Sequence, residues 1–117
     1  MTTPPASDAV TRTTVLDQTL AAPQHTDRVV VRRITIAPGQ AAGLHVHNGP
    51  VFGSIETGAA VYQIEGGPAV TLRPGDVFHE PKGVRVARFD ATDDGVTFLG
   101  YFLLARGEEP AMDFPTR

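Results

Sequence analysis

Turn-forming residues recur along this chain at intervals too short for any long helix. These residues are mostly Gly, Pro, Asn and Asp, and they occur at Pro38-Gly39, Asn48-Gly49-Pro50, Gly58, Gly66-Gly67-Pro68, Pro74-Gly75 and Asp93-Asp94-Gly95. The short segments between them are rich in Val, Ile, Phe, Tyr and Thr, several with period-2 alternation, which is typical of an antiparallel sandwich or barrel. We therefore predict an all-β protein with strands over residues 29–36, 43–47, 51–55, 60–64, 69–72, 76–80, 84–89 and 96–104.

Length and composition fit one ordinary globular domain. The chain has 117 residues, of which 41% are hydrophobic and 20% are charged, and a domain usually takes roughly 100–200 residues. Residues 1–12 mix Thr, Pro, Ser and Asp without periodicity, so we expect a flexible N-terminal segment there and a single β domain over residues 13–117. A short helix or edge strand over residues 10–22 would not change this fold class.

Charge and cysteine content exclude several classes of function. The formal net charge of -3 argues against nucleic-acid binding through bulk charge, and the basic cluster of Arg28, Arg32 and Arg33 fits the solvent face of a strand. No apolar run approaches the roughly 20 residues of a membrane helix, and the start lacks the pattern of a signal peptide. The chain has no cysteine, so any metal ion must be held by nitrogen and oxygen ligands. We expect a cytoplasmic protein that binds neither nucleic acid nor membrane.

Two histidines, His45 and His47, are separated by one valine in a predicted strand. Residues i and i+2 of a strand point to the same face, about 7 Å apart, so both imidazoles can reach one ion. Two surface histidines, or two histidines satisfied by neighbouring protein groups, would show the same spacing. The spacing alone therefore indicates a metal site without deciding for it.

The residues around these histidines continue into a longer pattern. It comprises Pro38-Gly39, Gly43, His45-x-His47 and Gly58, followed by Pro74-Gly75-Asp76-x4-Pro81-x-Gly83. This pattern resembles the two sequence motifs of the cupin superfamily, over residues 29–104. The resemblance implies a jelly-roll (double-stranded β-helix) barrel of two antiparallel sheets that enclose a pocket. It also implies a divalent metal ion such as Fe, Mn, Zn or Ni, held by two His and a Glu of the first motif and a His of the second.

Two of the four ligand positions that the resemblance implies carry other residues. The Glu of the first motif falls at Val51 or Phe52, and the His of the second motif falls at Val86. The best substitutes are His79 and Glu80, on a strand that should run antiparallel beside the one starting at residue 51. Because side chains alternate along a strand, only one of the two can face the pocket.

We favour His79, which gives a metal site of His45, His47 and His79, a set suited to Zn, Fe or Mn. With Glu80 facing inward instead, the set becomes two His and one carboxylate, as in non-haem Fe(II) oxygenases. The choice between these two neighbours decides the chemistry of the site.

Glu80, Arg88 and Tyr62 are the candidate catalytic residues. Arg88 lies two residues after Val86, so it points inward if Val86 does, and a buried Arg would pair with Glu80 or with an anionic substrate. Tyr62 is a candidate hydroxyl donor of the pocket lining, with packing on a half-buried strand as the alternative.

The resemblance leaves the reaction open, because single-domain cupins include dioxygenases, isomerases, cyclases and lyases. We predict an oxygenase-type enzyme that binds one divalent metal and acts on a small aromatic or dicarbonyl substrate. The alternatives are a metal-dependent isomerase, cyclase or lyase, and a non-catalytic ligand-binding or sensor cupin with a degenerate metal site. We also expect a homodimer, because strand 96–104 is apolar on both faces and its outer face needs a cover.

Overall fold

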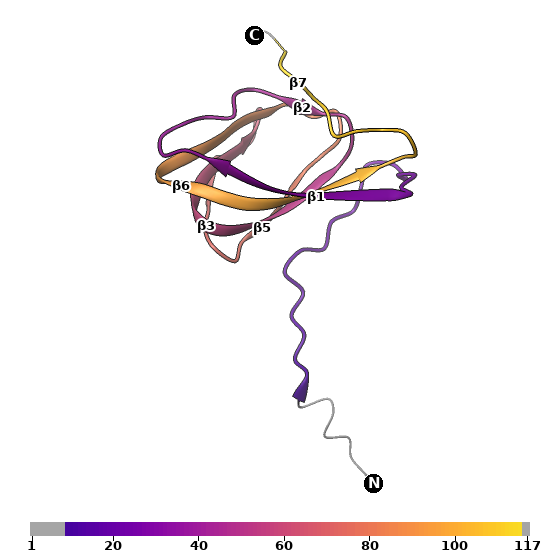
Figure 1. The fold of residues 1–117 in the computed structure, drawn as a ribbon, viewed down its shortest axis with the longest axis horizontal. Helices are drawn as coiled ribbons and strands as arrows, with labels where there is room; N and C mark the ends of the chain where they lie inside the picture. Colours follow the sequence, from indigo (N-terminus) through magenta and orange to yellow (C-terminus); the bar gives the residue numbers. More distant parts are fainter. Residues whose placement is uncertain (1–8, 116–117) are drawn as a thin grey trace.

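The computed structural model describes residues 9–115 of the chain. This part of the chain contains seven strands (Figure 1). They are β1 (Arg28–Ile36), β2 (Val46–His47), β3 (Val51–Ile64), β4 (Val70–Leu72), β5 (Val77–Glu80), β6 (Val86–Leu104) and β7 (Met112–Asp113). Within this range no helix has the length and hydropathy needed to span a membrane. Most of the predicted flexible segment, residues 1–8, lies outside the described residues.

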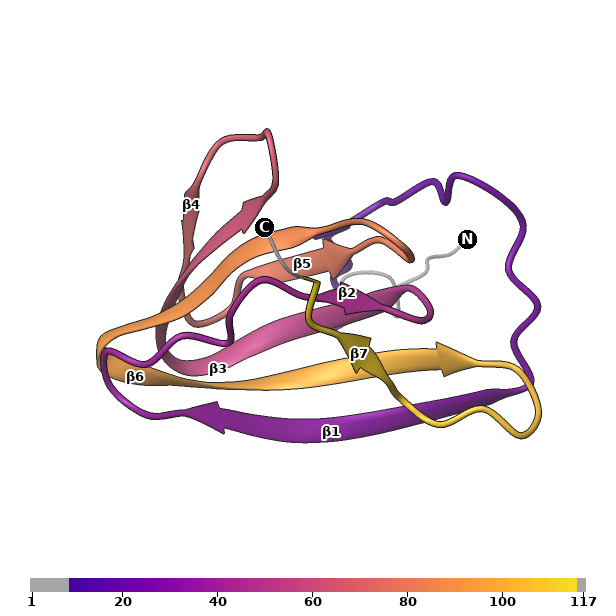
Figure 2. The same ribbon diagram turned by 90° about the horizontal axis from the view of Figure 1, so that it is seen from above.

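All strand pairs are antiparallel and form two sheets. The larger sheet has the order β1-β6-β3-β4, with β5 also paired to β3, and the smaller sheet consists of β2 and β7. Figures 1 and 2 show the strands curving around a common interior, with β2 and β7 across from β1. The prediction of an all-β fold with two antiparallel sheets is confirmed, and the arrangement is consistent with a jelly roll.

The predicted strands 51–55 and 60–64 are one long strand, β3, and strands 84–89 and 96–104 lie together in β6. The prediction of turns at Gly58 and at residues 93–95 is therefore wrong. Gly58 and Gly95 have φ angles of 72° and 71°, and the register of β3 on β6 shifts beside Gly58. Such irregularities bend a strand without ending its pairing.

The segment before β1 and the strand β7 also differ from the expectation. Residues 10–26 form neither a helix nor a strand, and residues 10–19 are exposed. β7 was not among the predicted strands, and it pairs with β2 so that Met112 lies opposite His47. The chain end described by the structure thus lies against the histidine segment.

Buried side chains from the inner faces form the core in two groups. The larger group contains Phe78, Phe89 and Phe98, whose ring centroids lie 4.8 to 5.8 Å apart. The smaller group consists of Val51, Phe102 and Leu104. Members of both groups line the cavity described below, so the packing of the core also holds the site in shape.

Candidate metal centre

His45 and His47 both point into the interior. His45 is held by a pair of backbone hydrogen bonds with Val86 of β6, and His47 lies in β2. The two residues are 3% and 5% exposed, and their ring centroids lie 4.9 Å apart. The i, i+2 spacing therefore places both imidazoles on one buried face, as predicted from the sequence.

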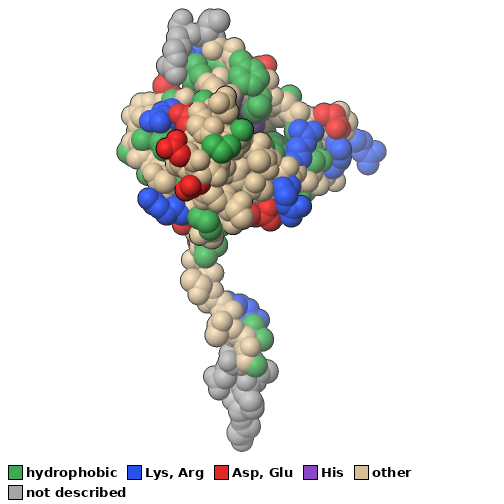
Figure 3. All heavy atoms as spheres, turned by 60° about the vertical axis from the view of Figure 1, so that its left-hand side comes forward, with side chains coloured by type: hydrophobic (Ala, Val, Ile, Leu, Met, Phe, Trp, Pro, Cys, Tyr) green, Lys and Arg blue, Asp and Glu red, His purple; other side chains and the backbone are tan. Residues whose placement is uncertain are grey.

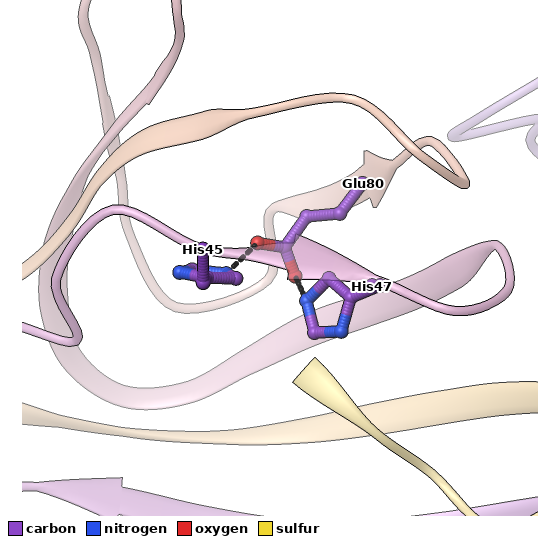
Figure 4. Close-up of side chains that lie close together, drawn as sticks. All are labelled: His45, His47 and Glu80. Carbon is purple, nitrogen blue, oxygen red and sulfur yellow. Dashed lines mark hydrogen bonds and ion pairs between the residues drawn. The ribbon is translucent and has the colours of Figure 1, made fainter. Parts of the chain in front are cut away.

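Glu80 of β5 joins the two histidines (Figure 4). Glu80 pairs with Val51 of β3 and is only 4% exposed. His45 Nε2 donates to Glu80 Oε1 and His47 Nε2 donates to Glu80 Oε2, both at 3.1 Å. One buried carboxylate thus bridges two buried imidazoles.

His79 is not brought to this cluster, and the preference for it over Glu80 is corrected. Alternation along β5 places the side chains of neighbouring residues on opposite faces, and the register that sets Glu80 against Val51 turns His79 outward. Its Nδ1 donates to the carbonyl oxygen of Val51 at 3.0 Å, and its ring stacks on Phe52 at 4.5 Å. His79 lines a separate hollow, together with Lys82 and residues 20–24.

The hydrogen bonds within the cluster set its charges in the absence of an ion. Burial acts to raise the pKa of Glu80, but hydrogen bonds from His45 and His47 hold it below its ordinary value. Burial acts to lower the pKa of His45, but hydrogen bonds to Glu80 and to the carbonyl oxygen of Gly43 hold it above its ordinary value. The site therefore carries an ionised carboxylate beside imidazole nitrogens that can exchange a proton for a cation.

The other candidate catalytic residues, Tyr62 and Arg88, are not part of the cluster. Tyr62 is buried, and its hydroxyl donates to the carbonyl oxygen of His79 at 2.6 Å. Burial raises the pKa of Tyr62, and the negative charge of Glu80 raises it further, to a smaller extent. Neither the Tyr62 side chain nor that of Arg88 lines the cavity.

The inward orientation expected for Arg88 is wrong because β6 changes register beside it. Gln63 pairs with Arg88 and Ile64 pairs with Val86, so one extra residue, Ala87, stands in β6 between the two pairs. This bulge breaks the alternation that would place Arg88 on the face of Val86. Arg88 is exposed and donates to Asp90 at 2.8 Å.

A cavity of about 300 Å³ adjoins the cluster. Its walls are mostly apolar, and its polar side chains are His45, His47, Glu80 and Arg32. The other lining residues are Ile34, Ile36, Ala42, Val51, Phe89, Phe98, Gly100, Phe102, Pro110, Ala111 and Met112. In Figure 3, histidine atoms are visible in a hollow of the surface beside hydrophobic side chains. An apolar pocket with few convergent polar groups is the usual form of a small-molecule site.

The three side chains fit a divalent metal ion. One ligand atom from each of His45, His47 and Glu80 lies within 4.8 Å of the other two. His45 Nδ1 donates to the carbonyl oxygen of Gly43 at 2.8 Å, which orients the ring and leaves Nε2 for an ion. Among the described residues His47 Nδ1 is buried without a hydrogen-bond partner. Two imidazoles and a carboxylate suit Fe, Mn, Zn or Ni.

The two ligand positions filled by valine differ in their surroundings. Val51 lines the cavity directly opposite Glu80 across the β3–β5 pair, so Glu80 reaches the space that a carboxylate at position 51 would occupy. Val86 is completely buried beside His45 and does not line the cavity. The described residues thus offer three ligands where the family pattern implies four.

Residues 32–98 match the family model of the cupin domain, which is more than half of the chain. The chain belongs to the cupin family. A search of curated proteins found no match. Several solved structures are similar in fold to this chain. A cupin-like protein from Thermotoga maritima has a TM-score of 0.62 and 25% identity, and the match covers 71% of this chain and 62% of that one.

Two further solved structures with a similar fold are of enzymes. The lyase DddQ from Ruegeria pomeroyi, which acts on DMSP, has a TM-score of 0.64 and 23% identity over 74% of this chain and 43% of that chain. Oxalate decarboxylase from Bacillus subtilis has a TM-score of 0.62 and 20% identity over 76% of this chain and 24% of that chain. This cupin spans less than two thirds of each of these proteins, and the similarity to the two enzymes shows the fold alone.

Proposed function

We propose that this cupin holds one divalent metal ion with His45, His47 and Glu80 and acts as an oxygenase on a small organic molecule. The observation that carries the proposal is the buried Glu80 carboxylate between two imidazoles at an apolar cavity. Two His and one carboxylate are the ligand set of non-haem Fe(II) oxygenases. A bound ferrous ion would supply open positions at which dioxygen and substrate come together.

The chain's own residues prepare this site in three ways. The carbonyl oxygen of Gly43 fixes the orientation of His45. Burial of the three ligands excludes bulk water and strengthens their electrostatic interactions. The apolar cavity walls, which include Phe89 and Phe98, suit an aromatic or alkyl body and support a substrate of that kind.

A ligand-binding or sensor module is the second candidate function. Val51 and Val86 leave the family ligand set incomplete, and Glu80 already satisfies one nitrogen of each imidazole without an ion. Such a module would bind a small molecule in the same cavity without converting it. Turnover therefore separates the two candidates.

Oxygen consumption tests the proposed reaction. Protein loaded anaerobically with Fe(II) is mixed with small aromatic and dicarbonyl compounds in an oxygen electrode, and substrate loss is followed in parallel. We expect oxygen uptake that matches substrate loss and disappears in Glu80→Ala, with His79→Ala as the matched control that retains it. Substrate loss without oxygen uptake would indicate an isomerase or lyase, and binding without substrate loss would indicate the sensor module.

We also propose a homodimer in which a second copy covers the outer face of β1 and β6. Val29 and Val31 of β1 are 53% and 50% exposed, and they lie opposite Leu103 and Tyr101 of β6. Within the described residues β1 pairs only with β6, so its other edge is open. Exposed apolar side chains along an open sheet edge favour association with another chain.

Light scattering at micromolar concentration tests the dimer. The expected mass is twice the 12.4 kDa of one chain, and Val31→Lys is expected to yield monomers because it places charge in the apolar face. Val70→Lys is the control, since Val70 is similarly exposed, at 46%, on β4. A monomeric wild type contradicts the proposal.

The proposed setting is the cytoplasm. A chain without cysteine is compatible with a reducing compartment. Besides a second copy of the chain, a small organic molecule is the partner that we propose, and the net charge of -3 gives no support for a nucleic-acid partner.

A further inference from the structure

Arg32 is the one arginine among the residues that line the cavity beside His45, His47 and Glu80. It lies on β1 between Val30 and Ile34, two side chains that pack against the core. Alternation along the strand directs all three side chains to the inner face of the sheet. Arg32 is exposed, in line with the prediction of a solvent-facing residue, but its side chain also borders the cavity that His45, His47 and Glu80 share.

Arg32 lies beside the apolar wall of the cavity. Its partner across the β1–β6 pair is Gly100, which also lines the cavity and over which the side chains of Phe102 and Ile34 pack. The guanidinium carbon lies 5.6 Å from the centre of the Phe102 ring. The same ring lies 6.1 Å from the ring of His47. A single apolar side chain thus contacts both the arginine and one of the proposed metal ligands.

The guanidinium of Arg32 has no acidic partner within ion-pair distance among the described residues. The other two arginines of β1 do have one. Arg28 is 2.6 Å from Glu109, and Arg33 is 2.8 Å from Glu56. Arg32 therefore presents N–H donors at a largely apolar cavity, although its charge also acts on Glu109, whose pKa is lowered by Arg28 and, to a smaller extent, by Arg32. A guanidinium matches the two oxygens of a carboxylate.

We infer that Arg32 determines substrate specificity by binding the carboxylate of a small organic acid whose apolar body fills the cavity. This inference rests on the proposed function and assigns a substrate class to the same site. The carboxylate end lies at Arg32, and the other end of the molecule lies at His45, His47 and Glu80.

The geometry also selects the shape of the acid. Phe102 separates Arg32 from His47, and the walls along this path are apolar, with Ile34 and Phe98 among them. An acid whose carboxylate is joined to its reacting end by an aromatic or alkyl body fits this arrangement. A two-carbon diacid has no apolar body to place against these walls.

Calorimetric titration with a matched pair of probes tests the inference. 3-Phenylpropanoate and 3-phenylpropanamide share one apolar body and differ in charge. We expect the purified protein to bind the carboxylate at least about tenfold more tightly than the amide, the size expected for a charge-assisted hydrogen-bonded pair. In Arg32→Gln the two affinities become equal while that for the amide is unchanged, and Arg32→Lys retains part of the preference because it keeps the charge.

Arg33→Gln is the matched control, because it removes the same charge from the next residue, on the opposite face of β1. We expect it to keep the wild-type preference. The inference is overturned if the wild type shows no preference, if Arg32→Gln retains it, or if Arg33→Gln loses it equally. Repeating the titration after chelator treatment separates this result from the proposed function, because the preference due to Arg32 persists without a metal ion.

Discussion

Replacing Glu80 by Gln lowers the affinity of this cupin for a divalent metal ion by at least about 100-fold. Loss of a residue that only supports a ligand typically costs 10–100-fold, so loss of a ligand itself costs at least as much. Gln keeps the size of Glu80 but removes its negative charge. Its amide also turns an N–H donor toward one of the two imidazoles that now donate to the carboxylate. Competition with a chromogenic chelator, using Zn²⁺ and Mn²⁺ in turn, measures the effect.

His79→Gln is the matched control for this substitution. It changes the neighbouring residue, whose side chain lies on the opposite face of β5 and contacts Val51 and Phe52. We expect its metal affinity to equal that of the wild type. Equal affinities of Glu80→Gln and the wild type, or an equal loss in His79→Gln, would show that the ion is held elsewhere.

Replacing Gly58 by Ala lowers the free energy of unfolding by about 2–5 kcal/mol. Gly58 has a φ of 72°, and a residue with a Cβ atom pays roughly 1–2 kcal/mol in this conformation. Its added Cβ would also clash with the carbonyl oxygen of Gly95, so β3 and β6 would have to separate. Forcing atoms into a closely packed region costs a further 1–3 kcal/mol or so. Urea denaturation, with the m-value compared between variants, measures the loss.

Gly66→Ala separates the backbone conformation from the close approach of the two strands. Gly66 has a φ of 84°, but its added Cβ would meet no atom within 4 Å. We expect Gly66→Ala to cost only about 1–2 kcal/mol, the penalty of the conformation alone. If both variants lose the same stability, the contact between Gly58 and Gly95 does not constrain the fold.

The fold class follows from local signals, whereas the continuity of the long strands does not. Turn residues and alternation act within a few residues, so they identify extended segments and an all-β architecture. A glycine such as Gly58 is common both in turns and in bends of a continuous strand, so the sequence around it does not distinguish the two. Its role is set by Gly95, 37 positions further along the chain, because the two glycines face each other where β3 and β6 bend.

The site shows the same division between local and tertiary information. The i, i+2 spacing places His45 and His47 on one face, but alternation in β5 states only that His79 and Glu80 face opposite ways. The pairing of Glu80 with Val51 decides between them. For Arg88, the extra residue Ala87 in β6 reverses the expected direction.

Arg32 did have a signal in the sequence. It shares its parity along β1 with the apolar residues Val30, Ile34 and Ile36, which marks it as a residue of the inner face. Grouping it with its charged neighbours Arg28 and Arg33 concealed this pattern. Alternation therefore identifies Arg32 as a residue that borders the cavity, while its side chain remains exposed as the charge pattern predicts.

Anomalous diffraction from crystals of this cupin grown with Mn²⁺ or Zn²⁺ tests the central claim most directly. We predict one anomalous peak per chain within bonding distance of both imidazoles and of the Glu80 carboxylate. The account is contradicted if that position shows no peak while Glu80 keeps its two hydrogen bonds to His45 and His47, or if the peak lies at His79 instead.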